Sequence, residues 1–342
     1  MLKPGGTSRN HFVSLIKRIV HICIEVMSAK AKLFATLILV VIIVVLALIF
    51  YGTTQGKSDG KPLVSSLSTT SKKLPRPPSD CGLDSPDRIF GGTETALGEF
   101  SWTALLVAED TDGYKSTYCG ATLINSRYVV TAAHCINPIN WTLTAVRLGE
   151  HNITNGEEQD CDEYNTCANV PVEVGIEKVI LHEEYDANKK REYNDIALIR
   201  LNRDVGFSTY INPICLPLED SVRQMNHTGM KVTAAGWGYT ESNYSSEVKL
   251  KVSLDVMNHN RCVKVYKSAD IRLQDTQLCA GGKKGEDTCG GDSGGPLMRE
   301  IEGNYHLIGV VSFGAANCGT KGVPGVYTNV AMFVDWIQSK LE

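Results

Sequence analysis

The sequence lacks the paired spacings that mark structural zinc sites, since it has no C-x-x-C pair and no H-x-x-x-H pair. Zinc is therefore not the favoured partner of its eleven cysteines. Residues 89–342 also lack an excess of positive charge, because 22 Lys and Arg stand against 33 Asp and Glu, a balance of −11. Nucleic acids bind to basic faces, so this region is not expected to bind nucleic acid.

Charge is absent from Leu33 to Tyr51, a run of nineteen residues. As a helix with ~1.5 Å rise per residue, the run would span about 28 Å, close to the ~30 Å hydrocarbon core of a bilayer. Six basic residues and one acid precede it, which favours a cytosolic N-terminus. The pattern predicts a single-pass type II membrane protein with an extracellular body. A cleaved signal peptide and secretion is the alternative, because a start at Met27 would resemble one.

The apolar run divides the N-terminal part of the chain into a basic cytosolic tail at 1–32, a signal anchor at 33–51 and a flexible stem at 52–80. The tail has an amphipathic pattern that suits the inner leaflet, and Cys23 within it is either a palmitoylation candidate or a free thiol. The stem lacks cysteine and is rich in Ser, Thr, Lys, Gly and Pro, which is typical of a flexible linker.

Ten cysteines, from Cys81 to Cys318, follow the apolar run. An even number of cysteines together with N-x-[ST] sequons predicts an oxidising compartment and five disulfides. The candidate glycosylation sites are Asn140, Asn152, Asn226 and Asn243.

Three short motifs follow one another along the body: TAAHC at 131–135, NDIAL at 194–198 and GGDSGGP at 290–296. A serine hydroxyl is a weak nucleophile at neutral pH and needs an adjacent base. His134 can be that base for Ser293, and Asp195 can orient the imidazole. Singly, these residues could be a surface histidine, a turn aspartate and a glycine loop, but together they indicate a catalytic triad.

With these motifs, residues 81–342 resemble the chymotrypsin/trypsin family of serine proteases. The resemblance implies an all-β fold of two packed six-stranded antiparallel β-barrels with a C-terminal helix, here preceded by one N-terminal transmembrane helix. It also implies serine endopeptidase activity that requires no cofactor, with an oxyanion hole formed by the backbone N–H groups of Gly291 and Ser293. The β-rich runs 103–108 and 307–312, and the apolar spacing over 330–341, agree with this fold.

The resemblance also implies what the protease cuts. Asp287 lies six residues before Ser293, where the family has the base of its primary pocket, and an acid there favours substrates with Arg or Lys before the cleaved bond. Gly314 and Gly325 would leave the pocket open, and the segment from Ser312 to Gly314 would pair with the substrate backbone. The alternative for Asp287 is a solvated loop acid.

RIFGG at 88–92 resembles the family's activation site. Cleavage after Arg88 by an upstream protease would free the amino group of Ile89, which would form a buried ion pair with Asp292. The chain would then be a zymogen, with an activation peptide at 81–88 and the protease domain at 89–342. The alternative is that Arg88 is an ordinary loop residue.

The disulfide pairing follows from the same resemblance, because sequence alone does not fix connectivity. The implied pairs are Cys81–Cys215, Cys119–Cys135, Cys161–Cys167, Cys262–Cys279 and Cys289–Cys318. The first of these would keep the activation peptide attached after cleavage.

The segment EHNITNGEEQDC at 150–161 resembles the family's calcium loop. Calcium binds about 6–8 oxygens from carboxylates and carbonyls. The candidate ligands are Glu150, Asn152, Asn155, Glu157 and Asp160. An acidic, solvated loop without a metal ion is the alternative.

The pair Cys161–Cys167 is similar to one in the arthropod clip-domain proteases that activate other precursors. The hypothesis is therefore a membrane-anchored protease that activates protein precursors in a cascade. The alternatives are a catalytically silent, receptor-like ectodomain and a scaffold at the membrane.

Overall fold

The computed structural model describes residues 74–84, 93–136, 140–156, 158–162, 164–185, 192–240 and 244–342. The predicted tail and anchor, most of the stem and the activation bond Arg88–Ile89 lie outside the described residues. Within those ranges, no helix has the length and apolar character needed to cross a bilayer.

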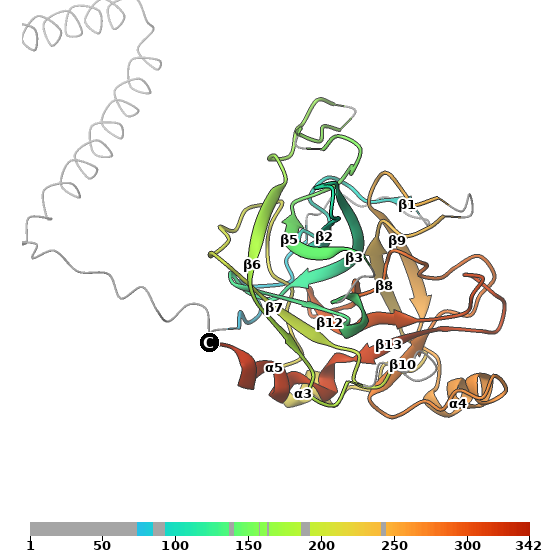
Figure 1. Cartoon of the computed structure of the whole chain (residues 1–342). Helices are drawn as coiled ribbons and strands as arrows, with labels where there is room; N and C mark the ends of the chain where they lie inside the picture. Colours follow the sequence, from blue (N-terminus) through green and yellow to red (C-terminus); the bar gives the residue numbers. More distant parts are fainter. Residues whose placement is uncertain are drawn as a thin grey trace, which may run out of the picture. The chain divides into compact units, whose positions relative to one another are not determined.

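The first half of the body is a closed barrel of six antiparallel strands in the order β2-β3-β4-β7-β6-β5 (Figure 1). The apolar residues of β2, β4 and β7 are largely buried, whereas those of β6 are mostly half-buried, and the closed barrel leaves no exposed edge. The strands are β2 (Thr103–Glu109), β3 (Lys115–Leu123), β4 (Tyr128–Thr131), β5 (Thr142–Leu148), β6 (Val172–Leu181) and β7 (Ala197–Leu201).

The second half is a seven-stranded sheet in the order β1-β9-β8-β11-β12-β13-β10. The two-residue β1 adds to the edge of β9, and a bridge between Val256 and Ala280 joins the ends of β9 and β10, so the other six strands close as a barrel. The strands are β1 (Thr93–Glu94), β8 (Lys231–Gly236), β9 (Leu250–Asp255), β10 (Gln277–Ala280), β11 (Pro296–Ile301), β12 (Asn304–Phe313) and β13 (Gly325–Asn329). The expected pair of six-stranded barrels is therefore found, with β1 as an addition.

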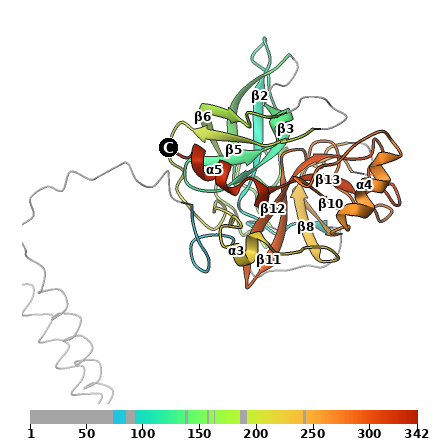
Figure 2. The ribbon, with the colours of Figure 1, turned by 90° about the horizontal axis from the view of Figure 1, so that it is seen from below.

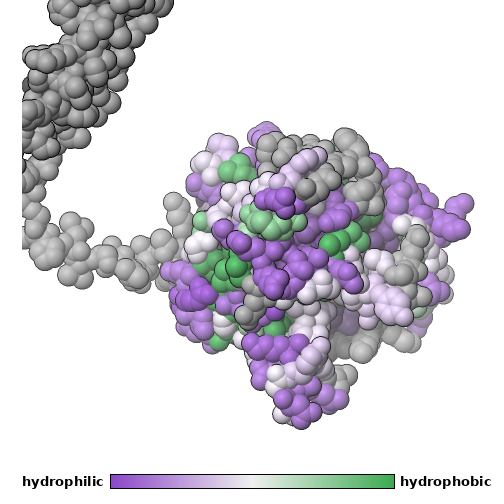
Figure 3. Space-filling view, turned by 90° about the horizontal axis from the view of Figure 1, so that it is seen from above, coloured by the Kyte–Doolittle hydropathy of each residue, from purple (hydrophilic) through white to green (hydrophobic). Residues whose placement is uncertain are grey.

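One hydrophobic core joins the two barrels. Leu106 and Leu198 of the first barrel pack in the same buried cluster as Met298 and Val310 of the second. Trp102 is fully buried there, and its indole N–H donates to the Met298 sulfur at 2.8 Å. The described part of the face in Figure 3 is mainly hydrophilic, with small separate apolar areas.

Short helices cover the ends of the barrels, and Figure 2 shows α5 beside the first barrel and α4 beside β10 and β13. The predicted closing helix at 330–341 is found as a short 3-10 turn, η2 (Val330–Met332), followed by α5. Helix α4 was not predicted, although Asn258 caps its first turn by accepting from the Arg261 N–H. The helices are α3 (Asp220–Arg223), α4 (His259–Lys267) and α5 (Val334–Lys340).

All five disulfides form with the pairing that the resemblance implied. Cys81–Cys215 joins chain segments 134 residues apart, so it ties the segment before the predicted cut to the body. The other four close loops of 6 to 29 residues. Cross-links of this kind restrict the unfolded chain and so stabilise the fold.

The segment 74–84 is docked on the body by more than its disulfide. Gly82 exchanges backbone hydrogen bonds with its neighbours, donating to the Pro213 carbonyl at 2.9 Å and accepting from the Tyr305 N–H at 2.8 Å. The side chain of Asn304 donates to the Cys81 carbonyl at 2.7 Å. The fold therefore includes the last residues of the predicted stem and the first residues of the predicted activation peptide.

Replacing Gly82 with alanine tests this docking. Gly82 has φ of 63°, and an added Cβ would lie 2.8 Å from the backbone nitrogen of Tyr305. We expect Gly82→Ala to lower the free energy of unfolding by about 2–4 kcal/mol, measured by denaturant unfolding. Gly303→Ala is the control, because Gly303 has φ of 85° and open space around it. Equal losses in both variants would contradict a docked segment.

Candidate active site

His134 and Asp195 are brought together by strand pairing. His134 lies in the short 3-10 helix η1 (Ala133–Cys135) after β4, and Asp195 lies in the turn before β7. Since Thr131 of β4 pairs with Ala197 of β7, these two connections emerge side by side. The imidazole Nδ1 lies 2.8 Å from Asp195 Oδ2, and the His134 backbone N–H donates to Oδ1 at 3.0 Å. This geometry presents the other ring nitrogen to the cleft.

The Asp195 carboxylate is fully buried and is also held from the second barrel. The hydroxyl of Ser312, on β12, donates to Asp195 Oδ2 at 2.5 Å, and the hydroxyl of Thr328, on β13, donates to the Asp195 carbonyl at 2.7 Å. A buried charge is tolerated when hydrogen bonds satisfy it. Ser312, predicted as a substrate contact, thus also fixes the carboxylate.

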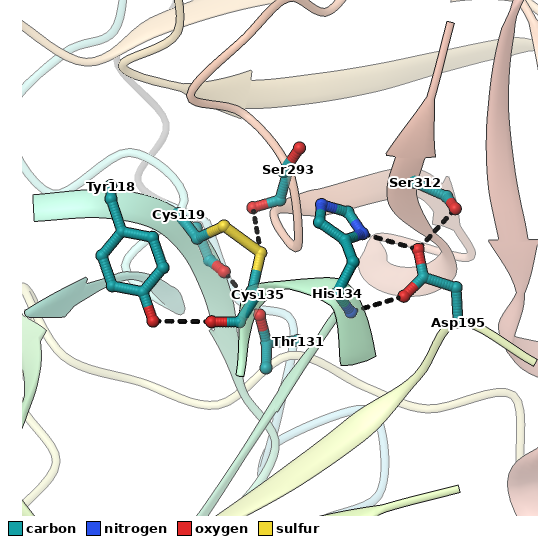
Figure 4. Close-up of a disulfide and its surroundings, with 9 residues drawn as sticks. Tyr118, Cys119, Thr131, His134, Cys135, Asp195, Ser293 and Ser312 are labelled. Atoms are coloured by element: carbon teal, nitrogen blue, oxygen red, sulfur yellow. Dashed lines mark hydrogen bonds and ion pairs between the residues drawn. A yellow bond between two sulfur atoms is a disulfide. The ribbon is translucent and has the colours of Figure 1, made fainter. Parts of the chain in front are cut away.

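Ser293 lies on the opposite side of the imidazole from Asp195 (Figure 4). Its loop rests on β3, because the Gly120 N–H donates to the Ser293 carbonyl at 2.8 Å. The disulfide Cys119–Cys135 attaches the residue after His134 to the same strand. Strand β3 therefore supports both the serine loop and the histidine turn. The structure brings the three predicted triad residues together, with His134 and Asp195 on connections of the first barrel and Ser293 in the loop before β11 of the second.

Two backbone N–H groups beside Ser293 fit the predicted oxyanion hole. Gly291 has φ of 97°, a conformation that favours glycine, and an added Cβ would lie 3.1 Å from the Gly238 Cα. Among the described residues, the N–H groups of Gly291 and Ser293 donate to no protein acceptor. Both are therefore available to an oxygen that develops negative charge at Ser293.

Asp287 lies in a partly buried pocket with glycine walls. Its carboxylate accepts from the backbone N–H groups of Thr288 and Gly319, each at 3.0 Å, and burial raises its pKa. A Cβ on Gly325 would lie 3.2 Å from Asp287 Oδ1, and one on Gly314 would lie 3.8 Å from the Gly325 Cα. The two glycines thus leave room above a carboxylate that has no positive partner among the described residues.

Asp292 is half-buried beside a cavity of about 680 Å³ that also reaches Asp287. Its carboxylate oxygens accept from the backbone N–H groups of Gly238 at 2.8 Å and Cys289 at 2.9 Å. Burial raises its pKa to about 6. Within the described ranges Asp292 forms no ion pair, so a positive group in this cavity would stabilise it.

The predicted calcium loop brings Glu150 and Asp160 together, but hydrogen-bond donors surround the Asp160 carboxylate. Asp160 Oδ2 accepts from the N–H groups of His151 and Asn152, at 3.0 and 2.9 Å. Asp160 Oδ1 accepts from the Asn155 side-chain amide at 2.9 Å.

Hydrogen-bond donors surround the Glu150 carboxylate in the same way. Its carboxylate accepts from the His151 N–H at 3.0 Å and from the Arg147 guanidinium at 3.3 Å. Glu157 lies outside the described residues. Calcium needs a group of oxygens free to face it, and a guanidinium stands beside one of these carboxylates, so the residues as placed do not fit a calcium ion.

The four sequons differ in their surroundings. Asn140 and Asn226 are exposed, whereas Asn152 is half-buried, and Asn243 lies outside the described residues. The Asn152 side chain accepts from the Thr154 hydroxyl at 2.6 Å. Asn140 and Asn226 are therefore the two described sequon asparagines that are more accessible for glycosylation.

Comparison with known proteins agrees with this geometry. The Trypsin family matches residues 89–337. CLIP domain-containing serine protease B4 of Anopheles gambiae is 47% identical over 291 residues, covering 84% of this chain and 80% of its own length. Spaetzle-processing enzyme of Drosophila melanogaster is 42% identical over 299 residues, covering 83% and 74%. The crystal structure of the Drosophila Grass clip serine protease of the Toll pathway matches with a TM-score of 0.65 and 37% identity, covering 76% and 73%.

Sequence reasoning missed the residues that support the predicted ones. Thr328 holds the Asp195 carbonyl, and at the Asp287 pocket the Thr288 hydroxyl lies 3.0 Å from the Tyr327 hydroxyl. Both Tyr327 and Thr328 lie in β13, whose sequence GVYTN indicates only a buried strand. No local pattern reveals which groups these two buried hydroxyls contact.

The bond from Ser312 to Asp195 can be tested at the serine itself. We expect Ser312→Ala to slow the labelling of Ser293 by a fluorophosphonate probe about tenfold, because a hydrogen bond to a buried carboxylate contributes about 1.5–3 kcal/mol. The control is Ser268→Ala, which removes an exposed hydroxyl that donates to the Val265 carbonyl. Unchanged labelling in Ser312→Ala would contradict a positioning role.

The buried Glu150 predicts a pH-dependent stability. Burial, with the neighbouring charge of Asp160, raises its pKa from 4.5 to about 7. Because the folded state holds this proton more tightly than the unfolded state, stability should fall as pH rises from about 4.5 to about 7. Glu150→Gln should reduce that fall by about 1–3 kcal/mol in denaturant unfolding across this range. The exposed Glu158→Gln should keep the wild-type slope, and a similar slope in Glu150→Gln would contradict this origin.

Proposed function

Because the chain belongs to the trypsin family of serine proteases, we propose that it is an active endopeptidase that cuts after arginine or lysine. The observation that supports this proposal is the placement of Ser293 across the His134 imidazole from Asp195, whose Oδ2 lies 2.8 Å from the ring Nδ1 (Figure 4). An inactive relative would be expected to lack a residue of the triad or of the pocket, and this chain has each of these residues.

Each step of the proposed reaction uses a group of the chain itself. His134 takes the proton of the Ser293 hydroxyl as its oxygen attacks the carbonyl carbon of the substrate. The carbonyl oxygen becomes an oxyanion that accepts from the N–H groups of Gly291 and Ser293. His134 then gives its proton to the leaving amine, and an acyl-enzyme remains on Ser293. Water, deprotonated by His134, releases the acid and restores the serine.

The substrate class follows from charge. A guanidinium or ammonium that enters the pocket gives Asp287 the positive partner that it lacks among the described residues. Gly314 and Gly325 leave space for the long side chain, and the strand end from Ser312 to Gly314 offers backbone groups for pairing with an extended peptide.

Activation is proposed to follow cleavage after Arg88 by another protease. The new α-ammonium of Ile89 would then enter the cavity at Asp292 and pair with its half-buried carboxylate. This pairing would fix the loop that carries Gly291 and Ser293. The bond Cys81–Cys215 would keep the upstream segment attached.

The proposed setting is extracellular. We place the protease domain outside the cell on a type II anchor at 33–51, with secretion after signal cleavage as the alternative. Glycans on the sequon asparagines and five disulfides suit that compartment. The name Spaetzle-processing enzyme describes a relative that processes a protein, and by analogy this chain would cleave protein precursors in a cascade.

A peptide panel tests the proposal. For protein cut after Arg88, with Ile89 confirmed as N-terminus, peptides with Arg or Lys before the cleaved bond should be cut about a hundredfold faster than others. Ser293→Ala should lower the rate about 10⁴-fold or more. Absence of turnover with every peptide would favour the silent ectodomain, and turnover without preference for Arg or Lys would remove Asp287 from its proposed role.

A further inference from the structure

We propose that the outer face of α4 is an exosite that binds an acidic segment of a protein substrate, four or more residues upstream of the cleaved bond. This inference rests on the proposed endopeptidase function. The exosite is a basic ridge of four residues, three in α4 and one in the connection from α4 to β10: Arg261, Lys264, Lys267 and Arg272.

Helix α4 turns one face to the body and the opposite face to solvent. Its buried residues, Cys262 and Tyr266, face the body. The three cations of the helix stand three residues apart and are all exposed, so they follow one another along its outer face. Figure 2 shows α4 on the outside of the second barrel, beside β10 and β13.

The charges of the basic ridge are not satisfied within the described part of the chain. None of its four cations takes part in an ion pair there. Residues 259–275 carry these four cations against two acids, whereas residues 89–342 as a whole have a balance of −11. Arg261 lies in the first turn of α4, where the helix dipole disfavours a cation. Stabilisation of the helix therefore does not explain Arg261, whereas an acidic ligand does.

The ridge lies beside the residues that hold the substrate in the proposed function. The Phe313 ring, in the strand end that would pair with the substrate backbone, packs edge-on against Tyr266 of α4, with 5.8 Å between the ring centres. The Tyr193 hydroxyl donates to the Arg272 carbonyl at 2.6 Å, and Tyr193 is two residues before Asp195. Helix α4 and the connection after it therefore border the substrate path.

The direction of the substrate chain leads its upstream part to α4. Ser312 donates to Asp195, so the cleaved bond lies at the Ser312 end of the pairing segment. An antiparallel substrate strand then has its third upstream residue near Gly314, and earlier residues continue past this end of β12. Four extended residues span ~14 Å at ~3.4 Å each, which matches the length of the nine-residue α4 at ~1.5 Å per residue.

The chain's own cleavage segment shows the kind of partner that fits. Residues 79–87, which precede Arg88, contain three aspartates and no Lys or Arg. In this chain the disulfide Cys81–Cys215 holds that segment to the body. The partner that we assign to the basic ridge is therefore another protein precursor, with a cleavage segment of the same acidic composition.

Peptides test the exosite with the full chain cut after Arg88. All peptides share the three residues before the cleaved bond, with arginine next to it, and the four residues further upstream are either all aspartate or all glutamine. We expect kcat/KM to be about tenfold higher for the aspartate peptide in low salt, through a lower KM. In high salt the difference should shrink to about threefold or less, because exposed charges are screened.

Substitutions in α4 locate the effect. The triple variant Arg261→Gln, Lys264→Gln, Lys267→Gln should cut the two peptides at rates within about twofold of each other. The triple variant with glutamate at the same three positions should reverse the order and cut the glutamine peptide faster. A merely structural role of these residues would not reverse a preference.

A matched control removes the same number of charges from the first barrel. Its three positions are exposed cations on or after strands of that barrel: Lys115→Gln, Lys178→Gln and Arg203→Gln. This variant should keep the preference for the aspartate peptide. Equal loss of the preference in both triple variants would mean that net charge, and not the basic ridge, attracts the acidic segment.

A short peptide separates this inference from the proposed function. It ends at the third upstream residue, and every variant should cut it at the wild-type rate. If the wild-type enzyme does not cut it, the proposed function fails. If it is cut but the aspartate and glutamine peptides are cut equally, the exosite is refuted. Retention on a heparin column that the triple glutamine variant loses would then assign the ridge to a sulfated polysaccharide instead.

Discussion

The arrangement of the two barrels depends on the hydrogen bonds that satisfy the buried carboxylate of Asp195. Its partners come from both halves: the His134 ring and backbone N–H from the first barrel, and the Ser312 hydroxyl from the second. Removing a carboxylate from water is costly unless hydrogen bonds replace its hydration. The charge is therefore satisfied only when the barrels are docked, and the same docking aligns the imidazole with Ser293.

Two further acids, each half-buried, lack this kind of side-chain support among the described residues. Asp287 and Asp292 are held by backbone N–H groups alone, and burial raises the pKa of each. Neither has an ion pair within the described ranges. In the proposed function their positive partners arrive from elsewhere, from the substrate at Asp287 and from the new N-terminus at Asp292. The binding of these positive groups to the two carboxylates would then produce both the substrate specificity and the activation.

Much of the candidate active site could be predicted from short motifs, because its chemistry constrains residues that are neighbours in the sequence. The loop around Ser293 needs glycines where the backbone has positive φ or meets β3, and this leaves a pattern that is visible without a structure. The five disulfide pairs followed from resemblance and were confirmed. The predicted calcium loop shows what a motif leaves out. Its acids are visible in the sequence, but the contact of the Arg147 guanidinium with Glu150 is not.

The sequence by itself determined the residue types of the triad, because nucleophile and base stand in local motifs, and the resemblance that these motifs carry implied the all-β class. Only the tertiary structure decided which groups surround them. Thr328 and Ser312 reach Asp195 from positions more than 100 residues away in the chain. Contacts of this kind depend on how the strands pair and how the barrels pack, so a sequence pattern does not predict them.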